Sequence, residues 1–231
     1  MNTDLKYWYL RDHRLFSTLK SDELKQLCVI IGFKKAQKGD IIYFTDTEIP
    51  RIYFLKKGAI KIVKINSEGE EFIQDIIQKG DLFGELSLDN RPAADEYAIA
   101  LTNDVVLCSF LLSDFEALML RKPDLALSYT KLMGLRFRRI SNNYQNLIFK
   151  DAATRLGLFL MNWAINEGQT LNETIVINNY LTQNDIAQII CTTRQTVVSL
   201  LNEWEKNGII QYDRKQIVVF NTEKLKKIAK M

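Results

Sequence analysis

Polar side chains suited to reading DNA bases are spaced one helical turn apart near the end of the chain. If residues 183–190 and 194–207 form two helices with a tight turn between them, the second helix presents Arg194, Gln195 and Ser199 outward. Arginine pairs with guanine and glutamine with adenine in the major groove, while serine and threonine reach phosphates or bases. The stretch therefore predicts a helix-turn-helix. The predicted DNA-contacting residues are Thr182, Gln183, Thr193, Arg194, Gln195, Thr196, Ser199 and Lys215.

The residues that would hold these two helices together have suitable types. Ala187 provides the small side chain needed where the helices cross, and Thr193 is placed to cap the second helix. The turn usually carries glycine, but Cys191 stands there, so we expect a left-handed backbone at a cost of about 1 kcal/mol. The apolar anchors expected on the inner faces are Ile186, Ile190, Val197, Leu200 and Leu201.

A β-hairpin, or wing, is predicted directly after the helix-turn-helix. Gly208 would end the second helix, and residues 209–212 and 216–220 would form strands around Asp213-Arg-Lys. From Leu181 onward the chain carries eight Lys and Arg residues against five Asp and Glu residues, whereas its overall net charge is only +3. This local basic bias is compatible with phosphate contacts. The alternative is a plain helical hairpin with a solvated surface.

A long helix is predicted from Pro123 to about Phe149, because proline is tolerated in a first turn. Residues that suit a helix interface recur there in alternating steps of four and three, the spacing of a coiled coil. These seam residues are Ala126, Thr130, Met133, Phe137, Ile140, Tyr144 and Leu147, and the last five are the predicted dimer interface. The alternative is a helix that packs on its own domain through Leu125, Leu127, Leu132 and Leu135.

Short apolar or alternating runs with glycines between them fill residues 33–110. Several strands about ten residues apart predict an antiparallel barrel or sandwich. The strands are expected at 41–44, 52–55, 59–65, 72–77, 97–101 and 105–110. A helix capped by Ser21 is predicted before them, and a helix with a capping box of Ser113 and Glu116 after them.

Length and composition suit an ordinary globular protein of one or two domains. The chain has 231 residues, of which 47% are hydrophobic and 26% charged. Its apolar runs are shorter than the roughly 18–20 residues that span a bilayer, and the N-terminus lacks a signal-peptide pattern, so no membrane partner is expected. Cys28, Cys108 and Cys191 are few and scattered, which indicates free thiols in a reducing compartment and a cytoplasmic location.

Three separated motifs resemble the Crp-Fnr family of bacterial transcription regulators, typified by the cyclic-AMP receptor protein and the fumarate-nitrate reductase regulator. They are Gly80-Asp-Leu-Phe-Gly-Glu-Leu-Ser87, Phe149-Lys-Asp-Ala-Ala-Thr-Arg155 and residues 182–201. The resemblance covers essentially the whole chain and implies an α+β fold. Its parts would be an antiparallel β-roll of the jelly-roll, cyclic-nucleotide-binding-like type (1–122), a dimerisation helix (123–150) and a winged helix-turn-helix (151–231).

The same resemblance implies function and partners. Members of the family are homodimers. Their β-rolls sense a small-molecule effector, and their paired recognition helices bind a palindromic site on double-stranded DNA. RNA polymerase is the further implied partner, because residues 166–173 match a surface that touches it in some relatives.

The effector region departs from the cyclic-nucleotide pattern. In relatives that bind cyclic nucleotides, the segment matching Gly84-Glu85-Leu86 begins a phosphate cassette, and an Arg-Ser pair holds the phosphate. That pair falls at Asp95 and Glu96 here, so two carboxylates would face the phosphate. The position that meets adenine is Ile140, which cannot bond the purine edge, although the neighbouring Ser141 is retained. We therefore expect cyclic AMP and cyclic GMP to bind poorly, and the effector is unknown.

No cofactor is expected. An iron–sulfur sensor needs four thiolates, whereas the chain has three cysteines. A haem sensor usually needs histidine, and the single His13 is expected at the surface beside Asp12 and Arg14. A metal-dependent cupin enzyme would need two or three histidines, so neither a metal site nor an enzyme is predicted. Two alternatives are a cyclic-nucleotide regulator with a variant cassette, assisted by Arg91, and a nucleotide-binding regulatory subunit that binds no DNA.

Overall fold

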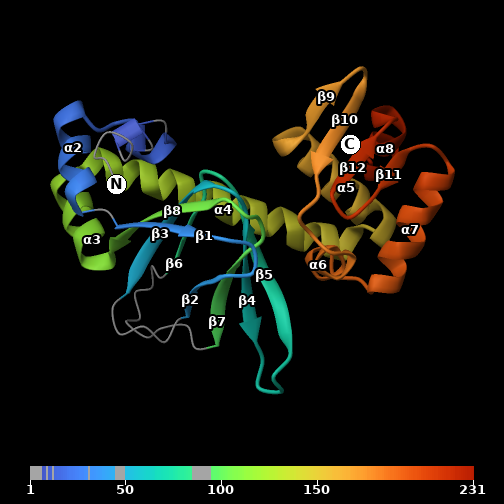
Figure 1. Cartoon of the computed structure of the whole chain (residues 1–231), viewed down its shortest axis with the longest axis horizontal. Helices are drawn as coiled ribbons and strands as arrows, with labels where there is room; N and C mark the ends of the chain where they lie inside the picture. Colours follow the sequence, from blue (N-terminus) through green and yellow to red (C-terminus); the bar gives the residue numbers. More distant parts are fainter. Residues whose placement is uncertain (1–6, 9, 12, 31, 45–49, 85–94) are drawn as a thin grey trace. The chain divides into compact units, whose positions relative to one another are not determined.

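The chain forms two compact units, residues 1–138 and 139–231, with the division inside one long helix. The computed structural model describes all residues except 1–6, 9, 12, 31, 45–49 and 85–94. Its class is α+β: an N-terminal antiparallel β-roll, a long helix and a C-terminal winged helix-turn-helix, as predicted (Figure 1).

Two four-stranded antiparallel sheets form the β-roll of the first unit. In one sheet the strand order is β1 (Gly32–Ala36), β8 (Val105–Leu111), β3 (Arg51–Lys57) and β6 (Leu82–Gly84). In the other it is β2 (Ile41–Phe44), β7 (Glu96–Ala100), β4 (Ile60–Ile65) and β5 (Glu71–Ile77). Side chains from both sheets, including Leu55, Ile60, Ile77 and Leu107, form one buried core. The six predicted strands are confirmed, whereas β1 and β6 were not predicted.

A second core covers the other face of the β1-β8-β3-β6 sheet. It joins Phe54 and Phe110 of the sheet to Phe16, Leu27 and Phe115 of the helices. The helices that contribute are η1 (Arg14–Phe16), α2 (Ser21–Ile30), α3 (Leu112–Arg121) and the first turns of α4 (Pro123–Phe149). Because this sheet is covered on both faces, β8 is buried at every residue from Val105 to Phe110. That burial, which includes Cys108, explains the continuous run of apolar residues in this strand.

The two predicted serine caps are wrong. Helix α3 already begins at Leu112, its cap residue makes no side-chain bond, and the Leu112 N–H donates to the Pro50 carbonyl oxygen at 3.0 Å. Strand β8 runs directly into this helix, so no loop is present in which Ser113 could act as a cap. Ser21 is likewise the first residue of α2 rather than its cap. There the Lys20 N–H donates to the carboxylate of Glu23 at 2.8 Å.

His13 is buried, which corrects the expectation of a surface histidine. Only 7% of it is exposed, and its ring centroid lies 4.0 Å from that of Phe54. Its Nδ1 accepts from the Leu15 N–H at 3.0 Å, and its Nε2 donates to the Gly80 carbonyl oxygen at 2.8 Å. The imidazole therefore caps η1 and ties the N-terminal segment to the turn before β6.

The second unit carries the predicted helix-turn-helix and wing. After the end of α4 come α5 (Ala152–Glu167), β9 (Gln169–Leu171), β10 (Thr174–Asn178), α6 (Gln183–Ile189), α7 (Arg194–Lys206), β11 (Ile210–Tyr212), β12 (Gln216–Val219) and α8 (Thr222–Ala229). The strands pair in the order β11-β12-β10-β9. Strand β9 and helix α8 were not predicted. Helix α8 packs on α5 so closely that a Cβ at Gly157 would lie 3.2 Å from the Ala229 nitrogen.

Candidate nucleic-acid interface and effector region

The turn between α6 and α7 is left-handed at Cys191, as predicted. Cys191 has φ 53°, and Ile190 before it is the C-cap residue of α6. The Thr192 N–H donates to the Ala187 carbonyl oxygen at 2.9 Å, and the Cys191 N–H to that of Gln188 at 3.1 Å. This bond pair is a Schellman motif, which usually has glycine at the left-handed position. A cysteine there costs about 1–2 kcal/mol of backbone strain.

Helix α7 separates a polar outer face from an apolar inner face. Its cap is confirmed: the Thr193 hydroxyl accepts from the Thr196 N–H at 3.1 Å. Arg194, Gln195 and Ser199 are exposed. The buried residues of the two helices are Ile186, Ala187, Ile190, Val197, Leu201 and Trp204, while Leu200 is half-buried. The polar side chains singled out from the sequence thus gather on one exposed face.

Two of the predicted contact residues are engaged in capping. The Thr182 hydroxyl accepts from the Asp185 N–H at 3.1 Å, and the Asp185 carboxylate accepts from the Thr182 N–H at 2.8 Å, which completes a capping box for α6. At α7 the hydroxyls of Thr193 and Thr196 lie 2.9 Å apart. Gln183 is half-buried on the first turn of α6. The hydroxyls of Thr182 and Thr193 therefore position the starts of α6 and α7.

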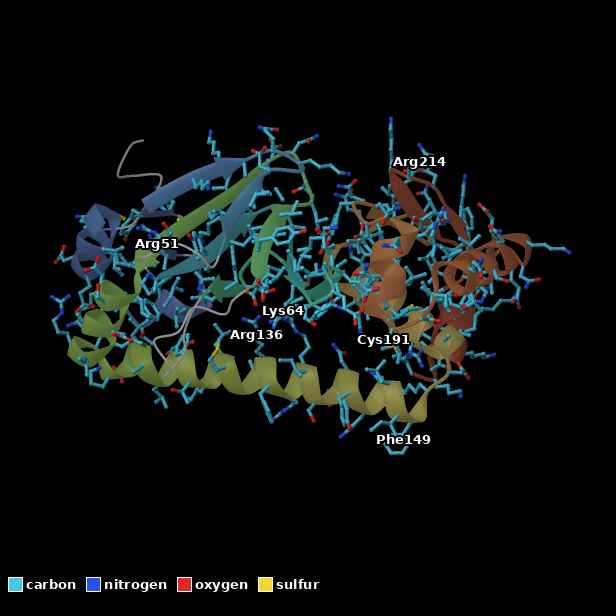
Figure 2. All side chains as sticks on the ribbon, turned by 90° about the horizontal axis from the view of Figure 1, so that it is seen from below. Arg51, Lys64, Arg136, Phe149, Cys191 and Arg214 are labelled. Carbon is cyan, nitrogen blue, oxygen red and sulfur yellow. The ribbon has the colours of Figure 1, made fainter. Side chains whose placement is uncertain are left out.

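The wing is a short turn held by the carboxylate of Asp213. Its Oδ1 accepts from the N–H groups of Lys215 at 2.6 Å and Gln216 at 3.0 Å. These backbone hydrogen bonds hold the pKa of Asp213 below its ordinary value. The Asn179 amide nitrogen donates to the Asp213 carbonyl oxygen at 2.7 Å and fastens the turn to the rest of the unit. Lys215 and Arg214 are exposed at the turn, where Figure 2 shows the Arg214 side chain extending outward.

Arg155 of α5 is a site residue to which the sequence analysis assigned no role. Its Nε donates to the Ile190 carbonyl oxygen at 2.9 Å, and its Nη2 to that of Cys191 at 3.1 Å. Its Nη1 donates to the Lys150 carbonyl oxygen at 2.5 Å. The only signal in the sequence was the position of Arg155 at the end of the second family motif, and its partners lie up to 36 residues away.

The described part of the effector region contains one obligatory glycine. Gly84 has φ 105°, and a Cβ there would lie 2.4 Å from the Arg51 carbonyl oxygen. Glu85, Leu86 and Arg91 lie outside the described residues. Asp95 is exposed with φ 70°, and Glu96 begins β7 opposite Lys64 of β4.

The predicted pocket residues are divided between the two compact units. Ile140 and Ser141 belong to the second unit, whereas Gly84, Asp95 and Glu96 belong to the first. Ile140 is 56% exposed, and Ser141 is half-buried.

Arg136 of α4 is a second residue whose contacts were not predicted from the sequence. Its Nη2 donates to the Asp75 carboxylate at 2.8 Å and its Nη1 to the Leu82 carbonyl oxygen at 3.0 Å. Figure 2 shows this side chain reaching from α4 toward the strands. Arg136 thus fastens α4 to β5 and to Leu82 of β6, which lies two residues before Gly84. Phe83, the residue after Leu82, stacks on Tyr53 with ring centroids 5.2 Å apart.

The predicted seam of α4 is exposed in the single chain. Phe137, Ile140, Tyr144 and Leu147 are 73%, 56%, 65% and 40% exposed, and Met133 is half-buried. Packing on the first unit uses the adjacent face of the helix instead: Leu125 is buried and Tyr129 and Leu132 pack on the core. Of the four leucines proposed for such packing, Leu127 and Leu135 remain about half exposed.

No helix among the described residues is both long and apolar enough to cross a membrane.

Both units match known protein families. Residues 33–122 match the cyclic nucleotide-binding domain, and residues 154–228 match the Crp-like helix-turn-helix domain. The chain is 30% identical over 186 residues to the global nitrogen regulator of Synechocystis sp., covering 80% of this chain and 82% of that protein. It is 25% identical to the CRP-like cAMP-activated global transcriptional regulator of Mycobacterium tuberculosis, covering 84% and 86%.

A solved structure has the same fold. It is that of a CooA variant from Carboxydothermus hydrogenoformans, which is 26% identical and covers 95% of this chain and 97% of its own, with a TM-score of 0.74.

The wing turn should keep its hydrogen bonds to unusually low pH. Because the Asp213 pKa is lowered in the folded state, its carboxylate stabilises the turn at neutral pH, and that contribution is lost as the pH falls through the folded-state pKa. Amide chemical shifts of Lys215 and Gln216 should follow this titration with a midpoint below about 3.9, the ordinary value for aspartate. Asp213→Asn keeps an acceptor oxygen and should abolish the titration. A midpoint at or above the ordinary value would contradict the assignment.

Proposed function

Because the chain belongs to the Crp-Fnr family of transcription regulators, we propose that it acts as a homodimer that reads a palindromic DNA site with α7 of each protomer. The family consists of DNA-binding regulators rather than enzymes. The observation that carries the proposal is the exposed polar face of α7. This helix is capped by Thr193, and a wing turn with the exposed Arg214 and Lys215 comes after it. The two half-sites should lie roughly one helical turn, about 34 Å, apart.

The exposed seam of α4 supports the dimer. Exposed apolar side chains scattered singly are ordinary, but a contiguous apolar patch indicates an interaction surface. Phe137, Ile140, Tyr144 and Leu147 recur at steps of three and four along one helix. A second copy of the same helix supplies a matching stripe, because a two-fold interface pairs a surface with itself.

Replacing Phe137 and Ile140 with Glu should yield a monomer. The double variant would bring four carboxylates together in the dimer seam, and sedimentation velocity should show half the mass of the wild type. Leu135→Glu is the matched control, since two residues of helix place Leu135 about 200° from Phe137. An unchanged dimer for the double variant would remove the seam from the proposal.

Arg194 and Gln195 are proposed to read bases, and Lys215 to touch phosphate. Arg194→Ala should cost about 1–3 kcal/mol of binding and relax specificity at one base position. Lys215→Ala should weaken binding to all sequences alike and reduce the slope of log K against log salt by about 0.9. The operator comes from selection on random DNA, and binding to single-base variants is measured for each protein. An equal loss for Arg194→Ala at every site variant would show that Arg194 does not read a base.

The effector is proposed to be a small molecule other than cyclic AMP or cyclic GMP. The Mycobacterium tuberculosis relative is named as cAMP-activated, and Gly84 of the matching segment has φ 105°, a backbone conformation that favours glycine. However, Asp95 and Glu96 replace the pair that neutralises the phosphate. Losing one charged hydrogen bond costs about 1.5–3 kcal/mol, before the repulsion between like charges is added. A site of micromolar affinity would become millimolar or weaker, at about 1.4 kcal/mol for each factor of ten.

Calorimetry of the purified dimer with both cyclic nucleotides tests this proposal, and micromolar binding would overturn it. Asp95→Asn with Glu96→Gln removes both charges, and asparagine tolerates the left-handed backbone at position 95. Asp95→Arg with Glu96→Ser restores the pair of the family but strains that backbone. Recovered affinity in either variant would assign the weak binding to these two carboxylates.

RNA polymerase is proposed to contact residues 166–173, which include β9 and the exposed turn residues Asn172 and Glu173. The location proposed is the cytoplasm. No cofactor is proposed: both ring nitrogens of His13 already bond to backbone groups, which disfavours haem ligation. Cys28 and Cys108 are buried in the helix-covered core, and three thiols are fewer than an iron–sulfur cluster takes.

A further inference from the structure

Three backbone carbonyl groups converge on the guanidinium of Arg155. Those of Ile190 and Cys191 belong to the α6–α7 turn, at 2.9 and 3.1 Å, and that of Lys150 follows the last residue of α4, at 2.5 Å. Arg155 itself is half-buried on the first turn of α5, where its N–H donates to the Asp151 carbonyl oxygen. One side chain therefore joins the end of α4, the start of α5 and the turn that precedes α7.

The turn depends on this side chain for two physical reasons. The Schellman bonds satisfy carbonyl groups within α6, but the Ile190 and Cys191 carbonyls lie beyond them and accept from Arg155. In addition, Cys191 holds a left-handed backbone that favours glycine. A planar guanidinium has donors in a fixed fork and can serve all three carbonyls at once, which a lysine ammonium cannot do in the same geometry.

We propose that Arg155 is a positioning residue for DNA reading, which fixes the direction of α7 by holding the Ile190–Cys191 turn against the end of α4. The first residue of α7, Arg194, lies three residues after Cys191. A change in the turn therefore moves the base-reading face as a whole. This inference rests on the proposed function, because it assigns Arg155 a part in DNA recognition without a contact to DNA.

The main competing role is a direct phosphate contact. A residue that neutralises a phosphate contributes about 0.9 to the slope of log K against log salt. A positioning residue leaves that slope unchanged and instead lowers the discrimination between operator and random DNA. The two roles are therefore separable in one set of binding measurements.

The variants to compare are Arg155→Gln, Arg155→Lys and the charge-matched control Lys227→Gln, which removes an exposed cation of α8. In the full-length protein without DNA, hydrogen exchange at the Cys191 and Thr192 amides should be about tenfold faster in Arg155→Gln, equivalent to about 1.4 kcal/mol. Arg155→Lys should fall between Arg155→Gln and the wild type, and Lys227→Gln should match the wild type. With DNA, Arg155→Gln should lose operator affinity while binding random DNA at an unchanged salt slope.

A second substitution tests the mechanism. If Arg155 holds a strained turn, Cys191→Gly in the Arg155→Gln background should restore part of the operator affinity and slow the exchange again. Unchanged exchange in Arg155→Gln, a salt slope reduced by about 0.9, or absence of rescue by Cys191→Gly would each overturn the positioning role. The exchange arm needs no DNA. Failure of the wild type to bind any selected DNA would overturn the proposed function and, with it, the role of Arg155 in recognition.

Discussion

A helix can read DNA only if the turn before it has one conformation, and in this protein that turn is held from outside. The backbone at Cys191 is left-handed without the glycine that would make this conformation inexpensive. The Schellman bonds to Ala187 and Gln188 set the local path, and the guanidinium of Arg155 holds the two carbonyls that follow. The cap residue Thr193, the exposed polar face of α7 and the buried Val197 all follow directly after this junction.

The β-roll is organised around a different constraint, a sheet that is buried on both faces. One face of β1-β8-β3-β6 meets the second sheet, and the other meets η1, α2, α3 and the start of α4. Consequently the N-terminal segment and α4 are attached to the same layer of strands. His13 and Arg136 reinforce this attachment with bonds to the carbonyls of Gly80, in the turn before β6, and of Leu82, the first residue of β6.

Helix α4 has one apolar face that packs on the first unit and another that is exposed. Leu125, Tyr129 and Leu132 pack on the core of the first unit, and Arg136 continues the same face with bonds to Asp75 and Leu82. The adjacent face presents Phe137, Ile140 and Tyr144 to solvent in the single chain. The self-packing considered from the sequence thus uses one face of the helix, and the residues of the proposed intermolecular seam lie on the other.

The sequence by itself determined those features that depend on neighbours close along the chain. Alternating apolar runs, Pro123 at a helix start, the Thr193 cap and the left-handed turn at Cys191 are local, and the structure confirms them. The burial of His13 and the contacts of Arg136 and Arg155 were decided only by tertiary structure. Each of these side chains bonds to a carbonyl 35 to 67 residues away, and every residue type has a carbonyl. No residue pattern marks such an acceptor, so only the folded chain reveals which carbonyls a distant arginine or histidine meets.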